Sequence, residues 1–441
     1  MSIQQAIELA LGHHQSGRLA EAESIYRQVL AAQPNHPDAL HLYGVLACQC
    51  GQMEVGLELL RRAIVTKPND AYYISDLGHA LLNAGKSRDA IAEFRRALQI
   101  NPMLAGTWNT LGGAYLRLGD LDSAMENYVQ ALKLQPDFSL CRYNLSMAMF
   151  LKGDLEGAWS LAESRWEAKE LGLTIQNFAQ PRWDGSDLNG RRILLYAEQG
   201  FGDAIQFVRY VPMVQAQGGR VILAVAGELV RLMKQLPDVK QIVAHGDAMP
   251  AFDLQCPLLS LPGIFKTKLD TIPVRVPYLQ AKNDHSRWRK RMGEVNKKKI
   301  GLVWAGRPEH RNDANRSLKF RQLAPILDDK FIFYSLQKGP ASEQARTTNL
   351  IDWTNEIKDF ADAAGLMENL DLIITVDTAA AHLAGAMGKV VWVLLPFLPD
   401  WRWMMKREDS PWYPTMRLFR QPTIGDWETP IRQITEELSR L

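Results

Sequence analysis

The sequence is poor in cysteine and has almost no excess charge of either sign. Its 441 residues include 4 cysteines, 51 basic side chains and 49 acidic ones, which gives a formal net charge of +2. Cys48 and Cys50 lie two positions apart, a spacing that places their side chains on different faces of a helix and forms no metal-ligand pattern. Near-neutrality removes the bulk electrostatic argument for nucleic-acid binding, so we expect no nucleic-acid partner.

Long apolar runs are also missing. A stretch of about 18 apolar residues, which a membrane-spanning helix requires, occurs nowhere in the chain. The first residues lack the basic-then-apolar architecture of a secretory signal. We therefore expect a cytoplasmic protein without a transmembrane segment, in which the cysteines stay reduced.

Common cofactor and metal motifs are absent as well. The dinucleotide fingerprint G-x-G-x-x-G fails at Gly200, because position 205 is isoleucine, and no P-loop occurs. We find no D-x-D carboxylate pair in a suitable loop and no His/Cys cluster. These absences argue against a dehydrogenase or a nucleotide triphosphatase, and we predict neither a cofactor nor a metal site.

What the sequence does contain is a period of 34 residues. The recurring residues are Pro34, Pro68, Pro102 and Pro136; Gly17, Gly51, Gly85, Gly119 and Gly153; Gly44, Gly78 and Gly112; Ala22, Gly56, Ala90, Ala124 and Ala158; and Tyr26, Leu60, Phe94 and Tyr128. Small residues let two antiparallel helices approach, bulky residues fill the space between them, and proline ends the second helix. The pattern resembles the tetratricopeptide repeat and predicts an all-α superhelix over residues 1–168.

The concave groove of such an array usually holds an extended peptide or a partner helix. Its expected lining is chemically mixed and consists of Tyr72, His79, Asn109, Tyr143 and Met147. The positions of the asparagine ladder found in nucleocytoplasmic O-GlcNAc transferases read Leu42, Asp76, Thr110 and Asn144 here. The repeats thus predict a protein or peptide partner without specifying its chemistry.

A different pattern follows a connector at residues 169–190. Short apolar runs predict strands at 192–197, 221–225, 252–254, 299–306, 331–336, 371–376 and 390–395, with helical segments between them. This alternation predicts parallel sheets in two Rossmann-like lobes, 191–283 and 300–441, joined by a basic helix and linker at 284–299. Two such lobes fit a dehydrogenase, a periplasmic-type binding protein or a glycosyltransferase of the GT-B fold.

Residues 376–388, V-D-T-A-A-A-H-L-A-G-A-M-G, carry the strongest chemical pattern of this half. They place small residues at the start of a helix that follows a strand, where free N–H groups and the helix dipole can hold a pyrophosphate. The segment resembles the motif D-[TS]-G-x-x-H-L-A-x-A of the ADP-heptose heptosyltransferases, glycosyltransferase family 9, with Ala379 in place of glycine. The resemblance implies a GT-B fold and a nucleotide-sugar site formed by Asp377, Thr378, Ala379 and His382.

A second match to that family is the glycine-rich loop that ends in Gly202-Asp203. The resemblance makes Asp203 the candidate general base of an inverting transfer. Alternatively, Asp203 caps the helix that follows. Arg316 stands where the family has a phosphate-contacting lysine, and Arg307 is a second cation of the same loop. Gln337 ends a predicted strand, at a position that commonly faces the nucleotide in GT-B folds.

Aromatic and charged residues are dense at 399–403 and 407–413, and they suit either stacking on sugars or packing against the first lobe. Taken together, the sequence predicts an inverting, metal-independent glycosyltransferase of the hexosyl or heptosyl type. It would use a nucleotide-diphosphate sugar and an acceptor, expected to be a protein, recruited by the repeats. The alternative is a non-catalytic scaffold with a degenerate transferase-like domain.

Overall fold

The computed structural model describes residues 1–174, 176–237, 239, 241–281, 285–346 and 348–441. The chain divides into two compact units, Met1–Ala148 and Met149–Leu441. The boundary falls inside helix α9 (Ser139–Lys152), so α10 (Leu155–Ala162), which the sequence assigns to the repeats, belongs to the second unit.

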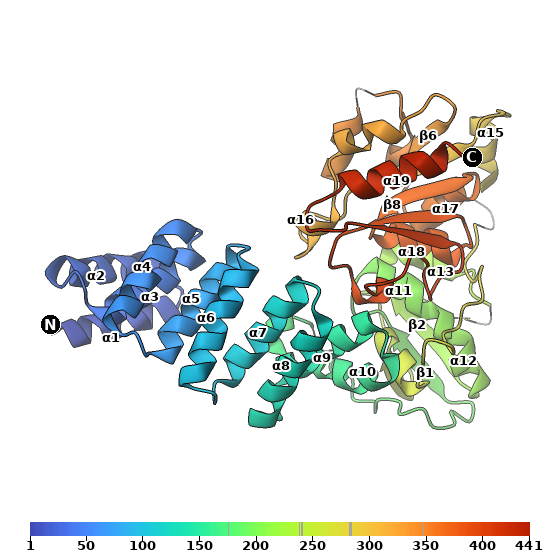
Figure 1. Ribbon diagram of the computed structural model, residues 1–441. Helices are drawn as coiled ribbons and strands as arrows, with labels where there is room; N and C mark the ends of the chain where they lie inside the picture. The colour runs from blue at the N-terminus through green and yellow to red at the C-terminus, as the bar shows by residue number, and fades with distance from the viewer. Residues whose placement is uncertain (175, 238, 240, 282–284, 347) are drawn as a thin grey trace. The chain divides into compact units, whose positions relative to one another are not determined.

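The first unit is built from α-helices in antiparallel pairs, coloured blue to cyan in Figure 1. The periodic prolines each lie two positions beyond the end of α2, α4, α6 or α8. The periodic glycines at 17, 51, 85 and 119 have φ of 77°, 79°, 76° and 77°, the left-handed conformation that reverses the chain between paired helices. The helices are α1 (Ile3–Gln15), α2 (Leu19–Ala32), α3 (Pro37–Gln49), α4 (Met53–Thr66), α5 (Ala71–Asn83), α6 (Ser87–Ile100), α7 (Ala105–Arg117), α8 (Leu121–Leu134) and α9.

Small and bulky residues meet between the paired helices as the period predicts. A Cβ added to Gly78 would lie 2.7 Å from the ring of Phe94, and one added to Gly112 would lie 2.7 Å from the ring of Tyr128. Both rings are almost completely buried. The pairing of glycine on the first helix with an aromatic ring on the second confirms the predicted packing.

Two adjacent glycines of α7 make this packing testable. We expect Gly112→Ala to destabilise the first unit by about 1–3 kcal/mol, because the new methyl group overlaps Tyr128. Gly113→Ala is the matched control, since its Cβ would meet only the Tyr128 hydroxyl, at 3.8 Å. That substitution should stabilise the helix by up to about 1 kcal/mol through helix propensity. Urea unfolding followed by circular dichroism measures both, and equal effects of the two substitutions would contradict the packing argument.

Some residues of the expected groove lining bond to or pack against other residues of the repeats. Asn144 donates a hydrogen bond from Nδ2 to Oδ1 of Asn109 at 3.0 Å, and Asn109 is 9% exposed. His79 packs edge-on against Phe94, and burial lowers its pKa. Tyr72, in contrast, is 64% exposed. Of these residues, Tyr72 is therefore the one most available to a partner.

The second unit contains two parallel sheets, as the alternation predicts. The strand order is β3-β2-β1-β4 in the first sheet and β10-β9-β8-β5-β6-β7 in the second, and the pairs of named strands are parallel. The strands are β1 (Arg192–Tyr196), β2 (Arg220–Val225), β3 (Gln241–Ala244), β4 (Leu254–Pro257), β5 (Lys299–Val303), β6 (Ile332–Ser335), β7 (Ile351–Asp352), β8 (Leu372–Val376), β9 (Val391–Leu395) and β10 (Met416–Arg420).

Helices connect and flank these strands. The α-helices of the second unit are α10, α11 (Phe201–Phe207), α12 (Val211–Ala216), α13 (Gly227–Met233), α14 (Leu261–Ile264), α15 (His285–Met292), α16 (Asp313–Arg316), α17 (Phe360–Glu368), α18 (Ala379–Ala386) and α19 (Glu428–Leu438). The basic helix expected between the two lobes is α15. Two short 3₁₀ helices, η1 (Glu163–Trp166) and η8 (Trp401–Trp403), contain Arg165 and Arg402.

Three strands were not predicted from the sequence, namely β3, β7 and β10. The first two are four and two residues long, too short for a periodic signal. In β10, exposed Arg417 and half-buried Arg420 interrupt the apolar run. All three lie at or next to a sheet edge, where polar residues are tolerated because one side of the strand faces solvent.

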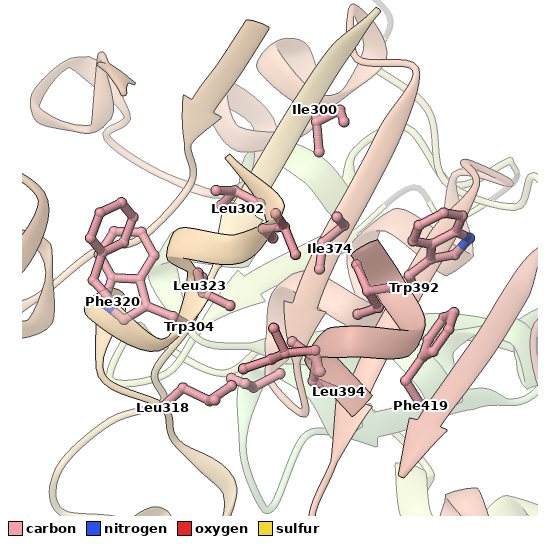
Figure 2. Close-up of a cluster of buried hydrophobic side chains, with 14 of the residues drawn as sticks. Ile300, Leu302, Trp304, Leu318, Phe320, Leu323, Ile374, Trp392, Leu394 and Phe419 are labelled. Atoms are coloured by element: carbon pink, nitrogen blue, oxygen red, sulfur yellow. The ribbon is translucent and has the colours of Figure 1, made fainter. Parts of the chain in front are cut away.

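One face of the second sheet carries a large hydrophobic core. Leu302, Ile374 and Leu394 project into it from β5, β8 and β9, as Figure 2 shows. Trp304 and Phe320, from the segment after β5, close its side with an edge-to-face contact at 4.7 Å between ring centroids. This core fixes the carboxyl ends of the central strands, where the predicted site residues begin.

Candidate functional site

The starts of two helices meet at the carboxyl ends of the two sheets. Helix α11 follows β1 of the first sheet, α18 follows β8 of the second, and the two helices are in contact. A side chain on Gly202 would place its Cβ 2.7 Å from Cδ2 of His382 and 3.6 Å from Cα of Ala379. Glycine therefore lets α11 approach α18, and the two segments that resemble the heptosyltransferases lie against each other.

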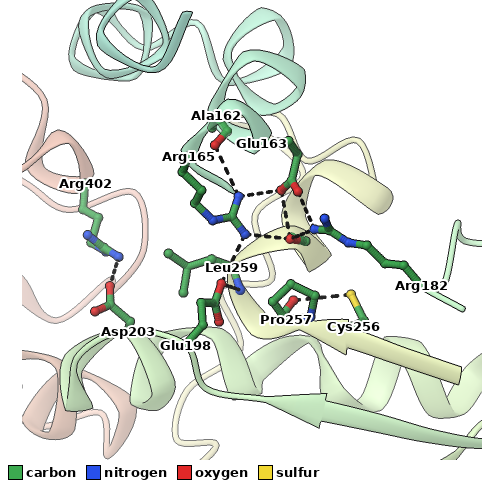
Figure 3. Close-up of polar contacts among 11 residues, drawn as sticks. Ala162, Glu163, Arg165, Arg182, Glu198, Asp203, Cys256, Pro257, Leu259 and Arg402 are labelled. Carbon is green, nitrogen blue, oxygen red and sulfur yellow. Dashed lines mark hydrogen bonds and ion pairs between the residues drawn. The ribbon is translucent and has the colours of Figure 1, made fainter. Parts of the chain in front are cut away.

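Asp203 has two partners. Asp203 does not precede the helix as an N-cap, because α11 begins at Phe201 and its N-cap is Gly200; its Oδ2 instead accepts from the N–H of Gly200 at 2.9 Å, which caps the helix from its third position. Its Oδ1 is paired with the guanidinium of Arg402 (Figure 3). Burial raises the pKa of Asp203, and the charge of Arg402 opposes that rise. The carboxyl group is thus oriented from both sides.

Sequence reasoning missed Arg402. This arginine lies in η8, between β9 and β10, and is 6% exposed. Its three nitrogens donate to three different side chains, those of Gln206, Asp400 and Asp203. The available signal was a cation placed between Trp401 and Trp403, where a buried charge requires partners from elsewhere in the chain.

The aromatic run that contains Arg402 is part of the protein core. Trp403 and Trp412 are fully buried, and Trp401 is 9% exposed. Trp401 packs against Phe150 at 4.5 Å and Trp159 at 5.7 Å between ring centroids. Trp412 packs against Phe207 of the first lobe with centroids 6.0 Å apart, as one of the two sequence alternatives expects, whereas Trp401 packs against α9 and α10.

His382 is buried and held on two sides. Its Nδ1 lies 3.0 Å from the Tyr413 hydroxyl, and its ring stacks on Trp403 with centroids 5.4 Å apart. Burial, followed by the positive charge of Arg402, lowers the pKa of His382 well below its ordinary value. The imidazole is therefore neutral at physiological pH and can exchange hydrogen bonds without adding charge.

At the start of α18, the carboxyl group of Asp377 has a raised pKa and lies near the cation Arg316. Burial raises the pKa of Asp377, the charge of Asp400 adds to this, and Arg316 opposes it. Arg316 donates from Nη1 to the main-chain oxygen of Asp377 at 3.0 Å. Thr378 occupies the N-cap position of α18 without a side-chain cap, and its main-chain oxygen accepts from the N–H of Ala381 at 3.0 Å. The Arg316 guanidinium and the first N–H groups of α18, those of Ala379 and Ala380, therefore lie at the same strand end.

Two further predicted binding residues, Gln337 and Arg307, differ in how far other groups of the protein engage them. Gln337 accepts from the N–H groups of Trp304 and Ala305 and donates to the main-chain oxygens of Ala305 and Lys338, all at 2.9–3.0 Å. A carboxamide has two donors and two acceptor positions, so this side chain is fully used in bracing the turn after β5. The Arg307 side chain is 76% exposed.

A cavity of about 100 Å³ opens at the carboxyl edge of the first sheet. Its lining includes Gln199 of the β1–α11 turn, Phe201 at the start of α11, Leu229 of α13, His245 after β3 and Arg307 after β5. Ligands of open α/β sheets bind at this edge of the strands. The cavity adjoins the Gly200–Asp203 turn, because Gly200 also lines it.

Within the residues that the structure describes, no group of three or more His, Cys, Asp or Glu could hold a metal ion. Over the same residues, the helices are too short or too polar for one of them to cross a bilayer.

Known repeats account for most of the first unit. Residues 13–75, 71–102 and 105–138 each match models described as tetratricopeptide repeat. The chain therefore contains tetratricopeptide repeats, as the 34-residue period predicts, and such arrays serve protein–protein interaction. Protein FlbA of Caulobacter vibrioides is 26% identical over 311 residues, which cover 64% of this chain and 52% of FlbA. The chain thus spans about half the length of this curated relative.

Solved structures with similarity to part of the chain include MamA and two TPR proteins. MamA is 23% identical with a TM-score of 0.34, and the match covers 40% of this chain and 98% of MamA. TTC0263 from Thermus thermophilus, a thermophilic TPR protein, is 22% identical with a TM-score of 0.34, covering 38% and 93% of the two chains. YrrB, a TPR protein with an unusual peptide-binding site, is 17% identical with a TM-score of 0.32, covering 37% and 84%.

Proposed function

We propose that the second unit is a GT-B-type glycosyltransferase that transfers a sugar, with inversion and without a metal ion, from a nucleotide-diphosphate donor. The observation that carries the proposal is the meeting of α11 and α18 through Gly202 and His382. It brings a carboxylate at the start of one helix close to the N–H donors of another. A candidate base and a candidate anion site therefore come from the two different sheets.

The donor diphosphate would bind at the start of α18. Helix N-termini favour anions through their unpaired N–H groups and the helix dipole. Arg316 is bonded to the strand end that leads into α18, and it would add a guanidinium suited to bidentate phosphate contact. His382 is neutral, so it would add a hydrogen bond without a second positive charge.

The acceptor would lie on the side of the first sheet. Asp203 would take the proton of the acceptor hydroxyl, whose oxygen attacks the anomeric carbon opposite the diphosphate. The bond between that carbon and the diphosphate oxygen then breaks, and the negative charge that develops is stabilised at α18. The cavity next to the Gly200–Asp203 turn offers room for the acceptor. We propose that the repeats recruit this acceptor as part of a protein.

A thermal-shift panel with ADP-, GDP-, UDP- and dTDP-sugars in chelator tests the donor site. A donor at about 100 times its Kd should stabilise the wild type by about 2.7 kcal/mol, because it binds only the folded state. We expect one nucleotide family to raise the melting temperature, and Arg316→Ala and His382→Ala to abolish the rise. Arg289→Ala, on the exposed face of α15, is the matched arginine control and should keep it. The absence of a shift with every donor would sink the proposal and leave a scaffold.

A further inference from the structure

The turn between β1 and α11 carries an acidic residue whose role the reaction above does not explain. Glu198 lies in this turn, five positions before Asp203, and its side chain is 1% exposed. Its Oε1 accepts from Nη2 of Arg165 at 3.2 Å and from the N–H of Leu259 at 3.3 Å. A carboxylate buried this deeply needs partners, and Arg165 and Leu259 offset part of its desolvation. The turn is thus attached to Arg165 through Glu198.

Arg165 is itself firmly held, as Figure 3 shows. It lies in η1, with a side chain that is 3% exposed, and donates from Nη1 to Oε1 of Glu163 at 2.6 Å and from Nη2 to Oγ of Ser260 at 2.7 Å. Glu163 is also paired with Arg182. Arg165 therefore has fixed partners besides Glu198 and forms a rigid anchor for the turn.

Hydrogen bonds from main-chain N–H groups hold the two ends of the turn. Ala197 donates its N–H to the Ala224 oxygen at 2.9 Å, and Gly200 donates to Asp203. Between these two points, Glu198 provides side-chain bonds to other segments. The same turn lines the cavity through Gln199 and carries Asp203 towards α18.

We propose that Glu198 and Arg165 are positioning residues, whose buried ion pair fixes the β1–α11 turn so that Asp203 faces the start of α18. Arg402 of η8 pairs with the Asp203 carboxylate, and Arg165 of η1 pairs with Glu198 in the turn. The role in catalysis rests on the proposed transferase activity, whereas the role in fixing the turn does not.

Glu198→Ala removes the attachment and leaves Arg165 paired with Glu163. We expect hydrogen–deuterium exchange of a peptide covering residues 197–208 to speed up. We also expect kcat for sugar transfer to fall by roughly 100-fold, because about 1 Å of misplacement near the reacting groups can cost that much. The donor KM should change by less than about twofold, since the donor site lies on α18.

Glu198→Gln is the rescue variant, because its amide oxygen can still accept from Arg165 and Leu259. It should restore both slow exchange and kcat. Glu368→Ala, an exposed glutamate at the end of α17, is the matched control and should alter neither. If Glu198→Ala does not fold, Glu198→Asp, which keeps the charge but shortens its reach, replaces it.

The outcomes separate the two proposals. Unchanged exchange of residues 197–208 in Glu198→Ala would show that the pair does not fix the turn. Faster exchange with unchanged kcat would overturn the positioning role. If no donor gives turnover, the transferase proposal fails, while the exchange measurement still decides whether the turn is held by Glu198.

Discussion

Replacing Asp203 with asparagine is expected to slow sugar transfer by a factor of roughly 10²–10⁴, the usual contribution of a general base. Asparagine has nearly the same shape, and its Oδ1 can accept from Gly200 and keep the cap on α11, while its Nδ2, a donor, replaces the oxygen that accepts from Arg402. Arg402 keeps its bond to Asp400 at 2.8 Å and is not left as an unpaired buried charge. The loss should therefore come from proton transfer and not from unfolding.

The chain offers a closely matched control for this substitution. Asp253 also accepts from a main-chain N–H and from an arginine, in this case both from Arg192. It lies at the opposite end of β1 from the site, and Asp253→Asn should keep full activity. Steady-state kinetics with radiolabelled donor measures transfer, and calorimetry measures donor binding. Full turnover by Asp203→Asn would falsify its assignment as the base, whereas joint loss of binding and turnover would indicate a structural role.

Replacing Glu198 with glutamine is expected to stabilise the second unit at neutral and alkaline pH. Burial raises the pKa of Glu198 from its ordinary value of 4.5 to about 7, and the charge of Arg165 only partly opposes the rise. The folded protein therefore binds this proton more tightly than the unfolded chain does. The charged groups that act on Glu198 include Arg165 and Asp203, and Glu198 in turn raises the pKa of Tyr196 and Cys256.

The sign of the effect follows from this linkage. Above a pH of about 7 the wild type bears the cost of the buried charge, and the cost disappears as the pH falls towards 4.5. At about pH 8, Glu198→Gln should thus be more stable by up to about 3 kcal/mol, and the two proteins should converge in acid. Denaturant melts at a series of pH values measure the difference, with exposed Glu368→Gln as the control. A variant less stable than the wild type at every pH would mean that the ion pair outweighs the burial cost.

The interior of the repeats could be read from the sequence because its contacts are local. Gly78 meets Phe94 and Gly112 meets Tyr128 within one helix pair, and each repeat packs on its neighbours. A fixed spacing along the chain therefore corresponds to a fixed spacing in space. The strands of the two sheets were also predictable where they are central and apolar, and they were missed in β3, β7 and β10 at or near the edges.

Local pattern could not decide the role of a side chain that suits either a ligand or the protein interior. Gln337 follows a strand, as a nucleotide-facing residue would, but its hydrogen-bonding capacity is used on the turn after β5. Trp401 and Trp403 have the composition of a sugar platform, but they lie in the core. In both cases burial decides the outcome, and burial depends on segments far away in the chain.

The sequence by itself determined the 34-residue helical array, the parallel sheets and the small-residue start of α18, because neighbouring residues in the chain set each of these features. The tertiary structure alone decided what surrounds the candidate base. Arg402 reaches Asp203 across 199 positions, and Arg165 reaches Glu198 across 33. A buried charge takes its partner from whichever segment the fold brings close, and no spacing along the chain records that choice.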